Sequence, residues 1–167
     1  MPSPGARETI LYGGGAAGIL DILDAFVVFG SLGVRPQRIL QSIASGAFGA
    51  EAFKGGEAMA AAGLAFHFLI ALIIAAVYYA AARKIRLLVE RPFLCGLAYG
   101  LIVRTVMQYI VLPLSAYKMG GAMPWPLLAN GLLIHAFGVG LPIALAAAWS
   151  ARRRAALSAN HSSAASW

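Results

Sequence analysis

Charged residues are scarce in this sequence of 167 residues. Only 11% are Asp, Glu, Lys or Arg, whereas 60% are hydrophobic, and a soluble domain usually carries about 25% charged residues. So little polar surface cannot cover a water-soluble globule. The scarcity of charge therefore excludes an ordinary soluble domain and favours an integral membrane protein, with the lipid bilayer as its main partner.

Several chemical motifs are missing as well. Cys95 is the only cysteine, which excludes an intramolecular disulfide and a cysteine metal cluster. The sequence has no phosphate-binding loop, and it has no clustered metal-ligand spacing. Gly13, Gly15 and Gly18 match the dinucleotide-binding glycine pattern, but without the preceding strand that this pattern needs. We therefore expect that the chain is not an enzyme.

The hydrophobic residues fall into four long blocks. About 20 residues are needed to cross a bilayer of about 30 Å, and a spanning segment must satisfy its own backbone, so each block predicts a transmembrane helix. The first residues, 1–8, lack a cleavage site, which predicts a retained first helix. The fold class is thus an all-α membrane protein, a four-transmembrane-helix bundle in a single domain, 1–154. The Ala- and Ser-rich tail, 155–167, is expected to be disordered. The blocks are residues 10–32, 58–82, 93–112 and 126–149.

The basic residues predict an orientation. The net charge of +7 does not indicate nucleic acid, because these residues lie between the apolar blocks, where they orient helices in a bilayer. The richer side is expected to be cytoplasmic, with both termini inside. That side holds Arg7, Arg83, Lys84, Arg86, Arg91, Arg152, Arg153 and Arg154, and the other holds Arg35, Arg38, Lys54 and Lys118. Aromatic residues mark the inner interface at Tyr78, Tyr79 and Trp149, and the outer interface at Tyr117 and Trp125.

The first outer loop, residues 36–53, predicts an extra helix. Pro36 suits a first helical position, and an apolar face recurs at helical spacing. The segment is too short and too polar to span. It is either an amphipathic helix lying flat at the interface, which is favoured, or a re-entrant segment. The apolar face consists of Ile39, Leu40, Ile43, Ala47 and Phe48.

Two helical hairpins share a pattern that suggests an internal repeat. The first and third blocks carry a Gly-x-x-x-Gly pair followed by a charged residue, and the second and fourth carry Gly-Leu-x-x-His. A parallel repeat would make His67 and His135 symmetry mates, whereas the abundance of Gly, Ala and Leu also permits a chance match. The first block carries Gly14, Gly18 and Asp21, and the third carries Gly96, Gly100 and Arg104. The second carries Gly63 and His67, and the fourth carries Gly131 and His135.

Five ionisable residues lie within the predicted spans, and helix rise places them near one plane. Each buried aspartate costs about 2.5–3.5 kcal/mol on insertion, so these groups need partners. We expect an ion pair between Arg104 and Asp21, with Asp24 as the alternative acid. Gln108 and Asn130 are candidate polar neighbours. Pro142 is expected to kink the fourth helix and free the carbonyl of Gly138. The five candidate site residues are Asp21, Asp24, His67, Arg104 and His135.

Three interpretations of this cluster remain open. It is a pathway for a proton or a small solute, a cofactor site in which two histidines ligate haem or hold a divalent metal with the aspartates, or a set of structural ties in an assembly protein without a ligand. The first of these leads. A homo-oligomer or a membrane-complex partner is consistent with each interpretation.

The second half of the chain, residues 93–149, carries a set of recognisable motifs. They are GLAYG with Gly96 and Gly100, the polar face to Gln108, VLPLSAY at 111–117, PWP at 124–126, and His135 before the basic residues. With these motifs the segment resembles the YagU-like group of uncharacterised bacterial inner-membrane proteins. The resemblance implies a bacterial inner-membrane location and no established enzymatic activity. His135 is the one functional residue that it carries over.

Overall fold

The computed structural model describes residues 3–116 and 124–164, and most of these residues are helical, with no strand among them. Four helices are long and apolar enough to cross a membrane. They confirm that the four hydrophobic blocks are helices, and their length and composition are compatible with a polytopic membrane protein. They are Glu8–Ser31, Gly56–Ala82, Pro92–Leu114 and Trp125–Asn160.

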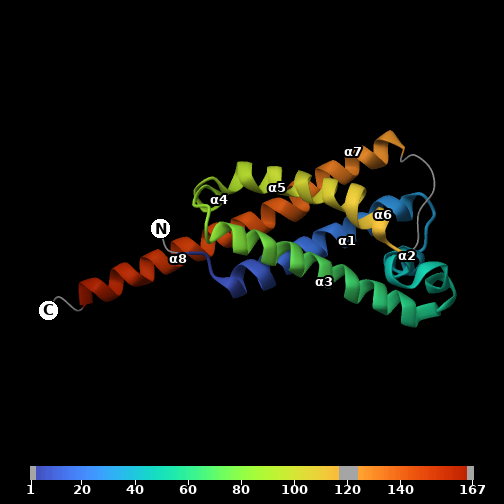
Figure 1. Cartoon of the computed structure of the whole chain (residues 1–167), viewed down its shortest axis with the longest axis horizontal. Helices are drawn as coiled ribbons and strands as arrows, with labels where there is room; N and C mark the ends of the chain where they lie inside the picture. Colours follow the sequence, from blue (N-terminus) through green and yellow to red (C-terminus); the bar gives the residue numbers. More distant parts are fainter. Residues whose placement is uncertain (1–2, 117–123, 165–167) are drawn as a thin grey trace.

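The four long helices lie alongside one another, with both chain termini at one end, here called the terminal end (Figure 1). The first joins a π-helical turn to α1, the second is α3, and the third and fourth each contain a π-helical segment. A short helix, α4 (Leu87–Glu90), connects α3 to α5 at the terminal end. The remaining bounds are η1 Glu8–Gly13, α1 Gly14–Ser31, α3 Gly56–Ala82, α5 Pro92–Val106, η3 Met107–Val111, α6 Leu112–Leu114, α7 Trp125–Leu133, η4 Ile134–Gly140 and α8 Leu141–Ala164.

The predicted extra helix is present at the opposite end, here called the α2 end. α2 spans Pro36–Phe48 and begins at Pro36 as expected, and a 3₁₀ turn, η2 (Gly49–Lys54), follows it. Gly49 has φ 63°, a left-handed conformation that lets the chain turn sharply where α2 ends. α2 packs against α3, and its Gly46 carbonyl accepts a hydrogen bond of 2.8 Å from the backbone of Ala116.

The buried face of α2 differs from the predicted apolar face. Ile39 is buried, but Phe48 is 48% exposed. Two polar residues, Gln41 and Ser45, are buried together with Ile39. Gln41 donates a hydrogen bond of 2.9 Å to the carbonyl of Gly56. A polar residue can occupy this position because the first turn of α3 offers it a backbone acceptor.

Small residues fill the space between the long helices. Ala17, Ala75, Ala144 and Ala147 are each fully buried. Large hydrophobic side chains point outward instead, as with Val27, which is 71% exposed. This distribution suits helices surrounded by lipid, because small residues let backbones approach closely while lipid covers the larger ones.

The two predicted Gly-x-x-x-Gly pairs each lie at a helix contact. A side chain added at Gly18 would meet the ring of Phe68 on α3, and one added at Gly100 would meet the backbone carbonyl of His135 in η4. Gly96 packs in the same way against Leu141. Each pair therefore joins the two helices of its own hairpin.

Two tyrosines, Tyr78 and Tyr99, pack against each other near the terminal end. Tyr78 is 1% exposed and donates a hydrogen bond of 2.9 Å to the carbonyl of Leu88. Tyr99 donates one of 2.7 Å to the carbonyl of Ile74, and the two rings lie 4.9 Å apart. Tyr78 was expected to mark a membrane interface, and its place in the core differs from that expectation because α4 supplies an acceptor for its hydroxyl.

Other predicted interface residues lie on the surface. Trp149 and Trp125 are 49% and 71% exposed. The guanidinium of Arg153 lies 5.5 Å from the Trp149 ring, and that of Arg83 lies 5.8 Å from the Tyr79 ring. Tyr117 and Lys118 lie outside the described residues.

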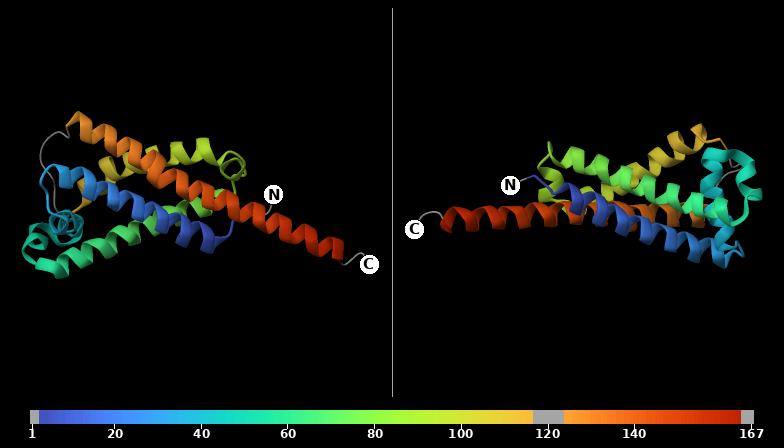
Figure 2. Two further views of the ribbon diagram at one scale, coloured as in Figure 1. Left: turned by 180° about the vertical axis from the view of Figure 1, so that it is seen from behind. Right: turned by 90° about the horizontal axis from the view of Figure 1, so that it is seen from below.

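The C-terminal segment corrects the expectation of a disordered tail from residue 155. α8 continues as a helix to Ala164 and projects beyond the other helices, as Figure 2 shows. Alanine has the highest helix propensity, and the preceding turns already provide the helix nucleus. A segment that follows a stable helix therefore extends it without a new nucleation step. Residues 165–167 lie outside the described residues.

Candidate functional site

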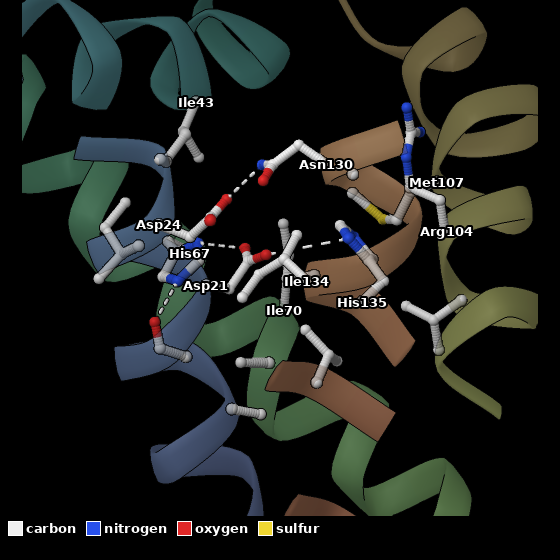
Figure 3. Close-up of a pocket in the computed structure, with 18 of the residues that line it drawn as sticks. Asp21, Asp24, Ile43, His67, Ile70, Arg104, Met107, Asn130, Ile134 and His135 are labelled. Atoms are coloured by element: carbon white, nitrogen blue, oxygen red, sulfur yellow. Dashed lines mark hydrogen bonds and ion pairs between the residues drawn. The ribbon is translucent and has the colours of Figure 1, made fainter. Parts of the chain in front are cut away.

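A cavity of about 320 Å³ lies between the long helices, next to α2. It brings together side chains from α1, α3, α5 and the fourth helix (Figure 3). All of the predicted site residues line it, and so do both predicted polar neighbours. They are Asp21, Asp24, His67, Arg104, His135, Gln108 and Asn130.

Asp21 occupies the middle of this group. Its Oδ2 lies 4.0 Å from Nδ1 of His67, and its Oδ1 lies 3.9 Å from Nδ1 of His135. The side chains of Asp21, His67 and His135 are 27%, 12% and 19% exposed. The two histidines that were expected at equal depth thus face the two oxygens of one carboxylate.

A hydrogen bond fixes the proton position on His67. Its Nε2 lies 2.8 Å from the carbonyl oxygen of Gly18. A carbonyl only accepts hydrogen bonds, so Nε2 carries the proton and donates. When His67 is neutral, its Nδ1 is therefore an acceptor that faces Asp21, which is also an acceptor. These two groups attract only if a proton, a cation or a donor such as water stands between them.

His135 presents a buried ring nitrogen, Nδ1, without a hydrogen-bond partner among the described residues. The 3.9 Å to Asp21 exceeds the usual range of about 2.7–3.2 Å for such a bond. Buried polar atoms nearly always have a partner. The position between Asp21 and His135 is therefore suited to a group that donates hydrogen bonds.

Asp24 lies one turn further along α1 and has a direct partner. Nδ2 of Asn130 donates a hydrogen bond of 2.7 Å to Oδ2 of Asp24. This bond joins α1 to α7, which are far apart in the sequence. Asp24 is therefore positioned to tie the first helix to the fourth.

Arg104 pairs differently from the prediction. It is 7% exposed, and its Nη1 donates a hydrogen bond of 2.8 Å to Oε1 of Gln108, one turn along the same helix. In the described part of the chain, the ion-pair partners of Asp21 within 4.0 Å are the two histidines. A side chain added at Gly131 would come within 2.8 Å of Nε of Arg104. The glycine therefore leaves room for the guanidinium.

The site lies beside two π-helical segments. η3 contains Gln108 and ends at Val111, and η4 contains His135 and ends at Gly140. Each segment ends two residues before a proline, Pro113 and Pro142 respectively. Proline removes a backbone donor, and a local π-helical adjustment can satisfy the freed carbonyls. The helix just before Pro142, where a kink was predicted, is π-helical and contains His135.

The charges of the cavity do not balance when both histidines are neutral. Among the described residues that line it, two aspartates face one arginine, which leaves one net negative charge. An uncompensated charge within a membrane is costly. One added positive charge, either a proton or a bound cation, makes the lining neutral.

The geometry does not favour the predicted cofactors. Within residues 3–116 and 124–164, no group of three or more His, Cys, Asp or Glu side chains is arranged to hold a metal ion. The carboxylate of Asp21 stands between Nδ1 of His67 and Nδ1 of His135, and Nε2 of His67 is bound to Gly18. Two ring nitrogens are therefore not free to face a haem iron from both sides.

Sequence reasoning did not place α2 at the site. Ile39, Ser42 and Ile43 of α2 line the cavity, together with Met107 of η3. The helical spacing of Ile39 and Ile43 was the available signal, since it predicted a face that must be covered.

Comparisons with protein-family models, curated proteins and solved structures found no match. The YagU-like resemblance therefore stays a prediction. What the chain does has to be argued from the cavity itself.

Proposed function

We propose that this chain is a multi-pass membrane protein that binds and releases a proton at Asp21, between His67 and His135. The observation that carries this proposal is the position of one carboxylate 4.0 and 3.9 Å from two imidazole nitrogens inside a cavity. Four helices long and apolar enough to cross a membrane support its location in a bilayer. We assign them to a four-transmembrane-helix bundle.

The chemistry of the three side chains favours a proton. Nδ1 of neutral His67 accepts, Nδ1 of His135 is unpartnered, and both carboxylate oxygens accept. A proton on Nδ1 of His67 turns this acceptor into a donor, and a proton on either imidazole removes the net negative charge of the lining. A ring movement of about 1 Å closes the distance to the range of proton transfer. Asp21 can therefore hold a proton shared with either histidine.

Access to the site is supported from the α2 end. A second cavity of about 580 Å³ lies beside the first, and the two share lining residues at Ser42, Ile43 and Ile70. The terminal end is filled by buried alanines instead, among them Ala148 and Ala151. We infer that α2 is the interfacial or re-entrant helix that covers the cavity on the outer side, with both termini in the cytoplasm of a bacterial cell.

Asp24 is assigned a structural role. Its carboxylate is already bonded to Asn130 at 2.7 Å, and a direct interhelical hydrogen bond of this kind stabilises helix packing in membranes. The proton-binding proposal therefore rests on Asp21 and not on Asp24.

Infrared difference spectroscopy of the purified protein tests the proposal. Between about pH 5 and about pH 8, where histidine titrates, we expect imidazole and carboxylate bands that exchange with heavy water. These bands should be lost in Asp21→Asn. The matched control is Glu90→Gln, which removes an exposed acid from α4 and should leave them intact. Wild-type spectra that carry no band dependent on Asp21 would show that the cluster does not exchange protons.

A further inference from the structure

The cavity around Asp21 is larger than a proton requires. Its volume of about 320 Å³ falls at the lower end of the range of about 300–1,000 Å³ that small-molecule sites occupy. Apolar side chains form much of its wall, including Val28, Ile43, Ile70 and Ile134. Figure 3 shows Ile43, Ile70 and Ile134 around the polar side chains. A cavity of this kind accommodates a molecule with one polar end and an apolar body.

The polar end of such a molecule must be cationic. The lining carries one net negative charge when both histidines are neutral, so an anion would add to the imbalance and a neutral molecule would leave it unchanged. A divalent metal is not favoured either, because no group of three ligands is arranged for one in the described chain. A singly charged organic cation supplies the missing charge.

The hydrogen-bonding groups specify the cation further. Three acceptor atoms lie beside this space: the two carboxylate oxygens of Asp21 and Nδ1 of neutral His67. A primary ammonium has three N–H donors that can be directed separately. A quaternary ammonium has the same charge but no donor, so it would leave Nδ1 of neutral His67 unsatisfied.

From these observations we propose that the cavity binds a small primary amine, as its ammonium ion, with the nitrogen at Asp21 and the apolar body against Ile43 and Ile70. This inference rests on the proposed function, because the ammonium and the proton each supply the one positive charge that the lining lacks. The two therefore compete for Asp21. The charged and titratable groups that line the cavity with Asp21 are Asp24 from α1, His67 from α3, Arg104 from α5 and His135 from η4.

Titration calorimetry with matched probes tests this inference on the purified protein in detergent. Phenethylamine is compared with phenethyl alcohol, which has a similar shape but no charge, and with the N,N,N-trimethyl derivative of the amine. We expect phenethylamine to bind at least about tenfold more tightly than either analogue. Binding should release a proton, which is measured by repeating the titration in buffers with different heats of ionisation. Below the pH at which the site takes up its proton, the apparent Kd should rise about tenfold per pH unit.

Variants separate the amine from the proton. Asp21→Asn should abolish amine binding, whereas Glu90→Gln should retain it. Ile70→Phe fills the apolar wall without changing a charge, so it should weaken the amine while the infrared bands of Asp21 persist. Equal binding of amine and alcohol, no binding of the amine, or unchanged amine binding by Asp21→Asn would each overturn the inference. The proposed function is judged separately by the infrared bands.

Discussion

At the residue scale, the partners inside the cavity depend on which face of its helix each polar side chain occupies. Asp21 and Asp24 both lie on α1, yet one faces two histidines and the other faces Asn130. This division gives them different roles. Asp24 accepts a hydrogen bond from Asn130, whereas Asp21 faces an acceptor on neutral His67 and, among the described residues, an unpartnered nitrogen on His135.

The proton position on His67 gives a prediction at this scale. Because Nε2 donates to the Gly18 carbonyl at 2.8 Å, neutral His67 should carry its proton on Nε2 and not on Nδ1. Nitrogen NMR spectroscopy of protein with isotopically labelled histidine distinguishes the two tautomers. Signals are assigned with His67→Ala, His135→Ala and His161→Ala. A neutral His67 protonated on Nδ1 would contradict the acceptor arrangement on which the site depends.

The polar residues that line the cavity were largely predictable at the residue scale, but their pairings were not. Ionisable side chains inside apolar blocks are costly, so they indicated the site residues directly, and helix rise placed them near one plane. Whether Arg104 meets Asp21 depends on how each helix is rotated about its own axis. That rotation is set by packing, as where Gly131 makes room for Arg104, and no spacing in a single sequence specifies it.

At the scale of elements, glycine contacts decide how closely the helices approach. Gly100 lies against the backbone of His135, so a methyl group there would meet atoms that cannot rotate away. Gly15 also lies in a long helix, but a methyl group there would meet nothing within 4 Å. Alanine substitutions at these two positions therefore separate the effect of helix packing on stability from the effect of helix propensity.

We predict that Gly100→Ala destabilises the protein and Gly15→Ala does not. Overpacking at Gly100 should cost about 1–3 kcal/mol, whereas alanine at Gly15 should gain up to about 1 kcal/mol from its higher helix propensity. Thermal unfolding in detergent measures both. Gly100→Ala should also weaken the Asp21 infrared bands, because it displaces η4 and with it His135. Equal melting temperatures for the two variants would contradict the close contact.

The helices themselves followed from the sequence, whereas their irregular parts did not. Length and hydropathy of each block predict a spanning helix because lipid permits few alternatives. The π-helical form of η3 and η4 depends on how the neighbouring helices accommodate Pro113 and Pro142. The composition of residues 155–164, rich in Ala and Ser, predicts disorder, but alanine favours helix once a helix precedes it, so α8 continues to Ala164.

At the scale of the whole molecule, an even number of long helices places both termini at the end opposite α2 (Figure 1). The same arrangement gathers Arg7, Arg83, Arg86 and the three arginines of α8, residues 152–154, at the terminal end. Lys and Arg are enriched on the cytoplasmic side of membrane proteins. The orientation proposed from charge therefore makes the α2 end, and with it the cavity, face the outside of the cell.

Cysteine labelling in intact cells tests this orientation and the access route together. In a Cys95→Ser background, single cysteines are placed at exposed positions: Ser3, Ser158 and Gln37. An impermeant maleimide should label Gln37→Cys from outside and should reach Ser3→Cys and Ser158→Cys only after the membrane is opened, because Gln37 lies in α2 and the other two lie at the terminal end. Labelling of Ser158→Cys in sealed cells would reverse the orientation. The amine and the proton would then enter from the cytoplasm, since the path past α2 is a property of the fold and not of its direction in the membrane.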